Sequence, residues 1–538
     1  MAQPSEKLAE SLEVLKALQK RGKVAIRSRD LTRTHRERLV AMGFLEEVIK
    51  GWYIPTRPDE TAGESTAWYA YFWKFCAAYL GDRFRADWCL SPEQSLSLHA
   101  GNWTVPRQLL VRALKARNKV TGLPHGTSLL EIRAALPRKK DFRELDGLRL
   151  FSVPSALISC PPGFYRRNPT DARTTLSMIR DGSEVLGQLL EGGHSVVAGR
   201  LAGAFRNIGR ARITDDIVKS MRAAGYQVRE NDPFEEQSAV VLSLRERSPY
   251  VNRLRLMWQV MREPVITRFP KAPGLPKNIE AYLKRVADAY VMDAYHSLSI
   301  EGYQVSPELI DRVRRRKWNP DANEDDRNQR NALAARGYWQ AFQSVEESLR
   351  RVLKGENAGA VAEKDHAAWY REIFAPSVTA GLLRPADLAG YRNAPVYIRR
   401  SMHVPPNGAA VRDLMPAFFD LLREETEPSV RAVLGHFIFV YIHPYVDGNG
   451  RIGRFLMNVM LASGGFPWTV VPLSKRNNYM SALEAASVGQ NIGDLTDFLA
   501  RLVEGNLKRK NSFGGAGIVR YLGDRGPASS ASRSTRED

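Results

Sequence analysis

The feature that most constrains the fold is a glycine-rich polar turn enclosed by apolar sequence on both sides. Residues 443–454 read HPYVDGNGRIGR, the six residues before them read FIFVYI, and Phe455-Leu-Met457 follows. Apolar runs of this kind are buried, and glycine permits the tight turn that must connect them. We therefore expect two buried segments, both helices, joined by a turn whose polar groups converge on one place.

The glycines and arginines of this turn have the properties of an anion site. Backbone N–H groups around Gly448, Asn449 and Gly450 point inward if the chain adopts positive φ, which glycine allows. A helix that begins near Gly450 offers unpaired N–H groups and a positive dipole end. Arg451 and Arg454 are three residues apart, so both project to nearly the same side, and their planar forks suit phosphate oxygens.

Two further residues of the turn suit reaction chemistry. Asp447 is a hard oxygen ligand of the kind that binds Mg²⁺ beside phosphates, and His443 can accept a proton from an attacking hydroxyl. Taken singly, His443 is typical of a core histidine, Asp447-Gly-Asn-Gly450 of a surface turn and the arginines of a solvated helix face. Because all of them occur together between buried segments, phosphate-ester chemistry on a nucleotide is the favoured interpretation.

This stretch resembles the signature HPFx[D/E]GNGRxxR of the Fic (Fido) family, whose enzymes mostly transfer AMP from ATP to a protein hydroxyl and release pyrophosphate. Tyr445 replaces the usual phenylalanine, and we expect its ring still to anchor the loop in the core. The resemblance implies a Fic helical bundle, with ATP and Mg²⁺ as cofactors. It also implies one role for each residue of the turn: His443 as general base, Asp447 as Mg²⁺ ligand, Gly448, Asn449 and Gly450 around the α- and β-phosphates, and Arg451 and Arg454 on the outer phosphates.

A second motif, Ser297-Leu-Ser-Ile-Glu301-Gly302, ends a predicted helix over about 279–301. By itself it predicts only a helix that is closed by Gly302. It resembles the Fic inhibitory motif [S/T]xxxE[G/N], which in one class precedes the signature. The resemblance implies that Ser297 and Glu301 are autoinhibitory, with the Glu301 carboxylate occupying Arg454 so that the phosphates of ATP are misaligned.

Between the two motifs lies a segment that resembles the Fic flap. Residues 391–398 (YRNAPVYI) and 401–406 (SMHVPP) read as a strand, a turn and a return stopped by proline. We expect an edge hairpin that holds a segment of the target by strand addition. The alternative is an ordinary surface hairpin.

The first 58 residues read as a winged helix-turn-helix. Leucines at helical spacing predict a helix over residues 6–21, residues 28–30 a brief second helix, and residues 33–42 a basic third helix. Residues 44–54 (FLEEVIKGWYI) predict a hairpin. The third helix would enter a major groove of DNA, with phosphate or base contacts from Arg33, Arg36 and Arg38. The alternative is a protein-interaction module with a solvated basic face.

This N-terminal part also resembles AbiEi-type antitoxin regulators over roughly residues 1–230. The quoted stretches are RLVAMGFLEEVIKGWYIP near residue 40 and SPEQSLSLHA from Ser91. The resemblance implies a regulatory module that faces DNA or RNA and carries no catalytic residues.

Composition sets the wider frame. A chain of 538 residues should hold more than one domain, and the excess of 79 Lys and Arg over 59 Asp and Glu favours contact with polyanions. Cys76, Cys89 and Cys160 lie far apart, with neither metal-ligand nor disulfide spacing. No signal-peptide pattern or membrane-length apolar run occurs, so we expect a cytoplasmic protein that does not contact a membrane.

We therefore predict a mainly α protein with four parts. These are a winged helix (1–58), an α/β middle domain (59–236), a Fic domain with a small β-hairpin flap (237–510) and a disordered tail (511–538). The predicted function is AMP transfer from ATP to a Ser, Thr or Tyr hydroxyl of a protein, this chain itself included, under autoinhibition by Glu301. The alternatives are a Fic enzyme that uses another nucleotide or removes AMP, and a DNA-binding, antitoxin-like regulator whose Fic domain senses ATP.

Overall fold

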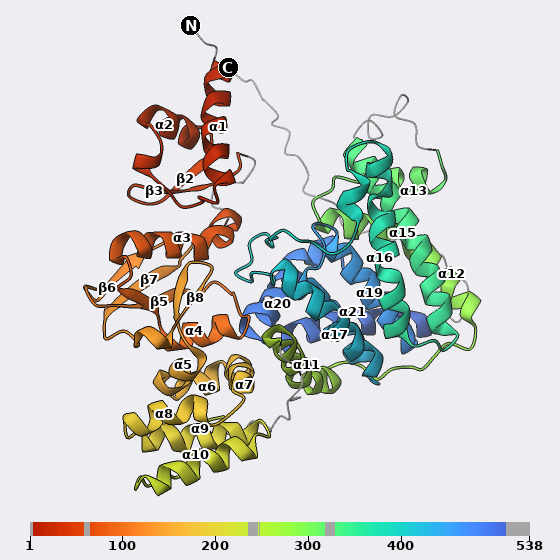
Figure 1. Cartoon of the computed structure of the whole chain (residues 1–538). Coiled ribbons are helices and arrows are strands. Elements are labelled where there is room, and N and C mark those ends of the chain that lie inside the picture. Colours follow the sequence, from red (N-terminus) through yellow and green to blue (C-terminus); the bar gives the residue numbers. More distant parts are fainter. Residues whose placement is uncertain (1–3, 59–64, 235–245, 247, 318–328, 513–538) are drawn as a thin grey trace, which may run out of the picture.

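The computed structural model describes residues 4–58, 65–234, 246, 248–317 and 329–512. The fold is mainly helical, with 62% helix and 8% strand, which confirms the predicted fold class. Figure 1 shows an elongated N-terminal column, which ends at α10, beside a rounded helical body built from the later residues. Within the described ranges, no helix combines the length and apolar character that crossing a bilayer demands.

Residues 4–58 form two helices and a three-stranded antiparallel sheet of order β1-β3-β2. The predicted first helix, basic helix and hairpin are all present, but the brief second helix is only a 3₁₀ turn. It stays short because Asp30 accepts the N–H of Arg27 at 2.7 Å, and Thr32 then caps the next helix. The elements are α1 (Pro4–Lys20), β1 (Ile26–Arg27), η1 (Ser28–Asp30), α2 (Arg33–Ala41), β2 (Leu45–Ile49) and β3 (Trp52–Pro55).

The next part is α/β. A four-stranded sheet of order β4-β5-β7-β6, parallel only between β5 and β7, and a β8–β9 hairpin pack with a long aromatic helix, α3. Val48 and Ile54 of the first part belong to the same apolar cluster, so these two parts share a core. The elements are α3 (Thr66–Phe84), β4 (Trp88–Leu90), α4 (Pro92–His99), β5 (Gln108–Ala113), β6 (Lys119–Gly122), β7 (Ser128–Arg133), η2 (Lys139–Asp141), β8 (Phe142–Leu145) and β9 (Leu148–Phe151).

A helical part follows, where the sequence predicted a continued α/β domain up to residue 236. Among the described residues no strand occurs after Phe151 in this region, because apolar side chains such as Leu201 and Phe205 recur at helical spacing and fill a separate cluster. The strands of the predicted α/β region therefore lie in its first half, and helices make up the second half. The elements are α5 (Val153–Ser159), α6 (Gly163–Arg167), α7 (Pro169–Met178), α8 (Ser183–Glu191), α9 (Ser195–Asn207) and α10 (Ala211–Ala223).

The C-terminal body is a helical bundle with one large apolar cluster. The predicted helix near 279–301 is present as α12, with Glu301 as its C-cap residue. The last helix runs to Ser512, and the rest of the predicted tail lies outside the described residues. The elements are α11 (Pro249–Arg268), α12 (Ile279–Ile300), α13 (Pro307–Arg314), α15 (Gln329–Leu353), α16 (Ala358–Thr379), η3 (Pro385–Leu388), α17 (Gly408–Glu424), α18 (Pro428–Ile442), α19 (Asn449–Ser463), η4 (Leu473–Lys475), α20 (Arg476–Gly489) and α21 (Gly493–Ser512).

The predicted flap hairpin is wrong, because residues 391–406 contain no strand. Pro395, Pro405 and Pro406 lack the N–H groups that a ladder needs, and several other backbone groups bond to residues outside the segment. The carbonyl of Met402 accepts the N–H of Val105 at 2.9 Å, and its N–H donates to Glu484 at 2.9 Å. The segment is thus held between the N-terminal column and α20 rather than folded on itself.

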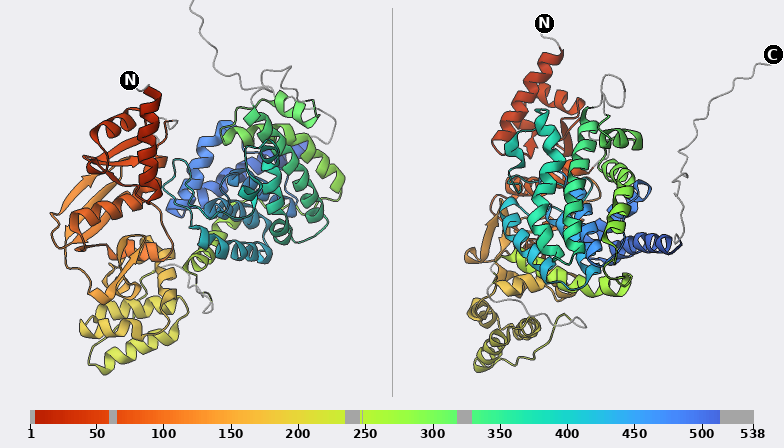
Figure 2. Two further views of the ribbon diagram at one scale, coloured as in Figure 1. Left: turned by 45° about the horizontal axis from the view of Figure 1, so that its top comes forward. Right: turned by 90° about the vertical axis from the view of Figure 1, so that its right-hand side faces the viewer.

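A buried ion pair joins the column to the body at a second place. Arg253 of α11 pairs with Asp171 of α7, and their side chains are only 3% and 0% exposed. Asn102 donates to the same carboxylate at 2.9 Å, and Tyr441 lies 3.2 Å from Nε of Arg253. The left view of Figure 2 shows the two parts side by side.

We predict that Asp171→Asn destabilises the chain by about 3–5 kcal/mol, because it leaves the Arg253 guanidinium buried without its counter-ion. Urea unfolding of the full chain measures this change. Glu37→Gln is the control: it breaks the exposed Arg33–Glu37 pair and should change stability by less than about 0.5 kcal/mol. Equal effects of the two substitutions would contradict a structural role for the buried pair.

Candidate active site

The predicted turn connects α18 to α19 in a conformation that depends on glycine. His443 follows α18 with a left-handed φ of 53°, and Gly448, with a φ of 81°, precedes α19. A Cβ atom on Gly448 would lie 3.0 Å from the Phe374 ring. Asn449 accepts the N–H of Tyr445 and donates to its carbonyl, both at 2.9 Å. The Asn449 side chain therefore closes the turn. Its backbone N–H is the group left for the predicted contact with phosphate.

Tyr445 anchors this turn in the core, as predicted. Its side chain is 1% exposed, and its ring stacks on that of Tyr370 with centroids 3.8 Å apart and planes at 9°. The hydroxyl group, which phenylalanine lacks, is buried with no hydrogen-bond partner among the described residues. Burial also raises the pKa of this hydroxyl well above its ordinary value. The substitution therefore keeps the packing and adds an unsatisfied polar atom.

His443 is positioned to be a neutral base. Its Nδ1 lies 3.2 Å from the carbonyl of Val440, which favours a proton on Nδ1 and leaves Nε2 as the acceptor. Burial lowers the pKa of His443 to about 4, although the carboxylates of Glu301 and Asp447 oppose this shift. The imidazole is therefore uncharged at neutral pH and able to take a proton.

Arg392, which the sequence did not single out, holds the loop around His443. Its Nε donates to the His443 carbonyl at 2.7 Å and its Nη2 to the Ile442 carbonyl at 3.2 Å. Its own N–H donates to the carbonyl of Pro444 at 2.9 Å. Burial lowers the pKa of Arg392 to about 10, so it stays charged, and its charge adds to the lowering of the His443 pKa.

Asp447 and Arg451 have opposite exposures. The Asp447 side chain is 63% exposed, and the Arg451 side chain, 3.3 Å away, is 1% exposed. The Arg451 guanidinium lies over the rings of Tyr303 and Phe374, at 5.3 and 5.0 Å from their centroids. Asp447 also accepts the N–H of Gly448 at 2.6 Å. Arg451 is therefore a fixed positive charge, while the Asp447 carboxylate faces solvent.

Arg454 is bound by the motif at the end of α12. Its Nε donates to the Ser297 hydroxyl at 2.9 Å, and its Nη2 donates to the Ser297 carbonyl at 3.0 Å and to Glu301 at 2.7 Å. A Cβ on Gly450 would lie 2.2 Å from Oε1 of Glu301, so only glycine lets the carboxylate approach this closely. Burial opposes ionisation of Glu301, but the charges of Arg454 and Arg451 prevail and hold its pKa below the ordinary value.

Residues outside the two motifs hold α12 and its end, and so support the contact between Arg454 and Glu301. Tyr338 donates to Asp293 of α12 at 2.7 Å, and burial raises the pKa of Asp293 to about 6 despite that bond and the charge of Arg454. Arg476 of α20 donates to the carbonyl of Ile300 at 2.9 Å and so fixes the residue before Glu301. No spacing in the sequence indicates these partners, because each contact joins elements far apart along the chain.

The structure thus brings together the residues predicted from both motifs: His443, Asp447, Gly448, Asn449, Gly450, Arg451, Arg454, Ser297 and Glu301. The arginines predicted to contact DNA lie apart, on α2, and each is engaged within the N-terminal part. Arg33 pairs with Glu37 at 2.6 Å, Arg36 donates to the Ser28 carbonyl at 3.2 Å, and Arg38 donates to the Lys7 carbonyl at 2.6 Å.

Residues 361–461 match the Fic/DOC family. The matched segment runs from α16 into α19 and includes the whole turn at 443–454. The chain is 28% identical over 267 residues to a protein adenylyltransferase Fic of Nematostella vectensis, with 49% of this chain and 58% of the relative covered. It is 30% identical over 224 residues to the protein of the same name in Drosophila virilis, with 41% and 42% covered. The chain therefore spans about half the length of these curated relatives.

Solved structures of Fic proteins resemble the chain only loosely. Fic-1 from C. elegans aligns with 61% of this chain and 92% of its own, at 18% identity and a TM-score of 0.37. A Fic domain-containing signaling protein from Bacteroides thetaiotaomicron aligns with 48% of this chain and 95% of its own, at 17% identity and a TM-score of 0.32.

We predict that Tyr445→Phe stabilises the chain by about 1 kcal/mol, because it removes a buried hydroxyl that has no partner within the described part of the chain. The midpoint of thermal unfolding reports this change. Tyr479→Phe is the matched control: the Tyr479 hydroxyl lies 2.7 Å from Nε2 of His436, so its loss should destabilise. A destabilising effect of Tyr445→Phe would indicate a partner for that hydroxyl.

Proposed function

We propose that this chain is a protein adenylyltransferase that transfers AMP from ATP to a Ser, Thr or Tyr hydroxyl of a protein and is autoinhibited by Glu301. The observation that carries the proposal is the convergence of a neutral imidazole, an exposed carboxylate and two buried arginines on the N-terminus of α19. The names of the relatives that cover this region support the same activity.

In the proposed reaction, Nε2 of His443 takes the proton of the target hydroxyl as its oxygen attacks the α-phosphorus of ATP. A new P–O bond forms to the target, the bond from the α-phosphorus to the bridging oxygen breaks, and pyrophosphate leaves with that electron pair. The N–H groups at the start of α19 and the charges of Arg451 and Arg454 stabilise the negative charge on the phosphates.

Asp447 fits the role of a Mg²⁺ ligand. Its carboxylate is 63% exposed beside the anion site. The described residues include no cluster of three or more His, Cys, Asp and Glu side chains suited to a metal, and Asp447 is the residue that would hold the ion. When bound, Mg²⁺ would neutralise phosphate charge.

The contact between Glu301 and Arg454 supports the proposed autoinhibition. The carboxylate lies 2.7 Å from Nη2 of Arg454 and against Gly450, where the γ-phosphate of ATP would otherwise bind. Because the pKa of Glu301 is held below its ordinary value, the carboxylate stays charged at neutral pH. The pH would have to fall through that lowered pKa before the Glu301 carboxylate is protonated. A change of pH near neutrality would leave it charged.

Glu301→Gly should increase AMP transfer on the order of 10²-fold, because realigned phosphates recover the loss that a displacement of about 1 Å causes. Intact-mass analysis after incubation with ATP and Mg²⁺ measures the AMP added to the chain or to a partner. The added mass also distinguishes AMP from the group that another nucleotide donor would leave.

Two variants control this experiment. Glu280→Gly removes an exposed acid from the first turn of the same helix and should leave transfer at the parent level. His443→Ala in the Glu301→Gly background should abolish transfer. Undiminished transfer without His443 would contradict the proposed base.

The pH dependence of the Glu301→Gly enzyme tests the state of His443. Because the pKa of His443 is lowered to about 4, the neutral base is fully present above about pH 5.5 and is lost as the pH falls through 4. Removal of Glu301 lowers this pKa further, since that carboxylate favours the imidazolium. We expect kcat/KM to be flat from pH 6 to 8, whereas half-maximal activity near pH 6.5 would indicate an ordinary histidine.

The alternative, a DNA-binding regulator whose Fic region senses ATP, is supported by the order of helices and hairpin in residues 4–58 and by the formal net charge of +20. The engagement of Arg36 and Arg38 with backbone carbonyls of their own part weakens it. A winged-helix, AbiEi-like assignment of this region stays a proposal, as does a cytoplasmic location.

A further inference from the structure

The residues of α12 that bind Arg454 belong to a longer polar stripe. Asp293, Ser297 and Glu301 follow one another at intervals of four residues, so they lie on one face of the helix. That face meets α19, because Arg454 of α19 bonds to both Ser297 and Glu301. Asp293 and Ser297 are only 4% and 2% exposed, whereas the Glu301 side chain is 28% exposed. The stripe therefore continues the contact with Arg454 into the core of the bundle.

Asp293 is bound by a residue of a third helix. Tyr338 of α15 donates its hydroxyl hydrogen to Asp293 at 2.7 Å. Its ring is fully buried, and its centroid lies 4.8 Å from that of Phe455 on α19. Burial and the charge of Asp293 raise the pKa of Tyr338 well above its ordinary value, while a hydrogen bond with the Ser297 side chain opposes this shift. Tyr338 thus connects two members of the stripe.

The resulting hydrogen bonds run in one direction. Nε of Arg454 donates to the Ser297 hydroxyl at 2.9 Å. The Ser297 hydroxyl bonds to Tyr338, and Tyr338 donates to Asp293. Arginine has no acceptor and an ionised carboxylate has no donor, so the two ends fix the orientation of both hydroxyls between them. Each bond in such a buried chain strengthens the next. Arg454 is therefore held by a chain that does not include Glu301.

This chain matters when Glu301 leaves. Arg454 is 4% exposed, and a buried guanidinium is costly without a negative charge nearby. In the proposed function Glu301 must leave before the γ-phosphate of ATP can bind, and Ser297 is then the remaining partner on α12. Asp293 is the second carboxylate of the stripe, and the charge of Arg454 favours its ionised form. A negative charge therefore stays close to Arg454 after Glu301 is displaced.

We propose that Asp293 and Tyr338 are positioning residues for Arg454. They act through Ser297 and hold the guanidinium in place for the γ-phosphate of ATP once Glu301 is displaced. This inference rests on the proposed function, in which Arg454 binds the outer phosphates. Glu301, at the exposed end of the stripe, is the partner that can be removed, and Asp293, at its buried end, is the permanent one.

The test compares ATP with ADP, which lacks the γ-phosphate, by isothermal titration calorimetry with Mg²⁺ near pH 8. The parent for this test is the full chain with Glu301→Gly, which frees the phosphate site, and His443→Ala, which prevents transfer during the titration. Because the pKa of Asp293 is about 6, its carboxylate is ionised at this pH. We expect the parent to bind ATP more tightly than ADP.

Tyr338→Phe, added to this parent, should weaken ATP binding roughly tenfold and leave ADP binding unchanged, as expected when a buried charge-assisted hydrogen-bond chain is broken. Asp293→Asn keeps an acceptor for Tyr338 but removes the charge, so it should weaken ATP binding as well. Tyr338→Phe keeps the ring that packs on Phe455, so the test stands if Asp293→Asn does not fold.

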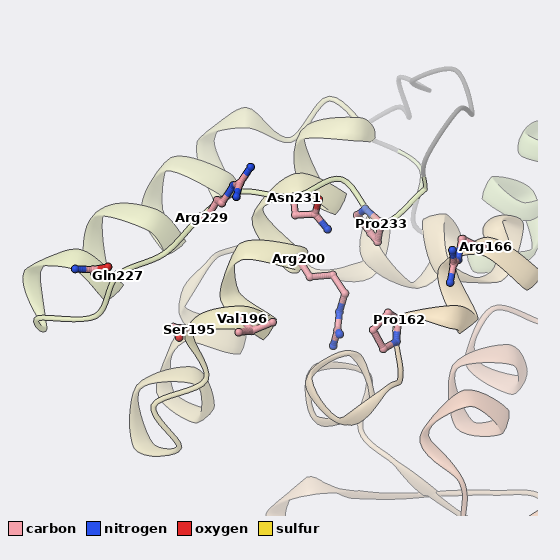
Figure 3. A pocket seen from close by; sticks show the side chains of 9 residues that line it. All are labelled: Pro162, Arg166, Ser195, Val196, Arg200, Gln227, Arg229, Asn231 and Pro233. Carbon is pink, nitrogen blue, oxygen red and sulfur yellow. The ribbon is translucent and has the colours of Figure 1, made fainter.

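Two substitutions serve as controls and should leave the affinities for ATP and ADP unchanged. Tyr290→Phe is the matched one: Tyr290 lies on α12, is fully buried, and its hydroxyl has no hydrogen-bond partner within the described ranges. Arg229→Gln controls for nucleotide that binds elsewhere on the chain. Arg229 is exposed and lines a cavity beside α9 in the column (Figure 3).

Equal weakening of ATP and ADP binding by Tyr338→Phe would indicate a purely structural role and overturn the proposal. ATP affinity that stays at the parent value in both Tyr338→Phe and Asp293→Asn would also overturn it. So would a parent that does not distinguish ATP from ADP, since Arg454 would then not contact the γ-phosphate. The titration does not depend on AMP transfer, so a lack of transfer in the Glu301→Gly enzyme would contradict only the proposed function.

Discussion

The buried guanidinium of Arg454 is the constraint on which the candidate active site depends. A charge at 4% exposure is costly unless it is paired, and its partners include Ser297 and Glu301 at the end of α12. This requirement fixes α12 against α19, and Arg476 supports the contact by donating to the carbonyl of Ile300, the residue before Glu301. The contact of Arg454 with the end of α12 therefore stabilises the packing of the bundle. In the proposed function the same contact inhibits AMP transfer.

The rest of the site is held in place by hydrogen bonds and ring stacking. Asn449 closes the turn on the backbone of Tyr445, the Tyr445 ring stacks on Tyr370, and Arg392 bonds two carbonyls around His443. A group that must exchange a proton needs a defined position, and these contacts supply it before any substrate arrives. The carboxylates of Asp447 and Glu301 keep appreciable exposure, at 63% and 28%, and His443 is partly exposed.

The two halves of the chain meet at the segment where the sequence predicted a flap. A strand pattern shows which residues can be extended, but it does not name the partner that completes their hydrogen bonds. Here the backbone groups of Met402 bond to Val105 of the column and to Glu484 of α20. The predicted hairpin therefore does not form. For the proposed function, a target that binds by strand addition would have to replace a contact made by the chain's own N-terminal column.

The sequence by itself determined the turn at 443–454, the helix that ends at Glu301 and the mainly helical class. These features are local: glycine at positive φ, apolar residues at helical spacing and capping residues act within a few positions of one another. Only the tertiary structure decided that Arg392 and Arg476 support the site, that Arg451 lies between two rings, and that no strand follows Phe151 among the described residues of the middle region. Each of these depends on which distant element supplies a partner for a buried polar group, and the burial that makes the partner necessary exists only after the chain has packed.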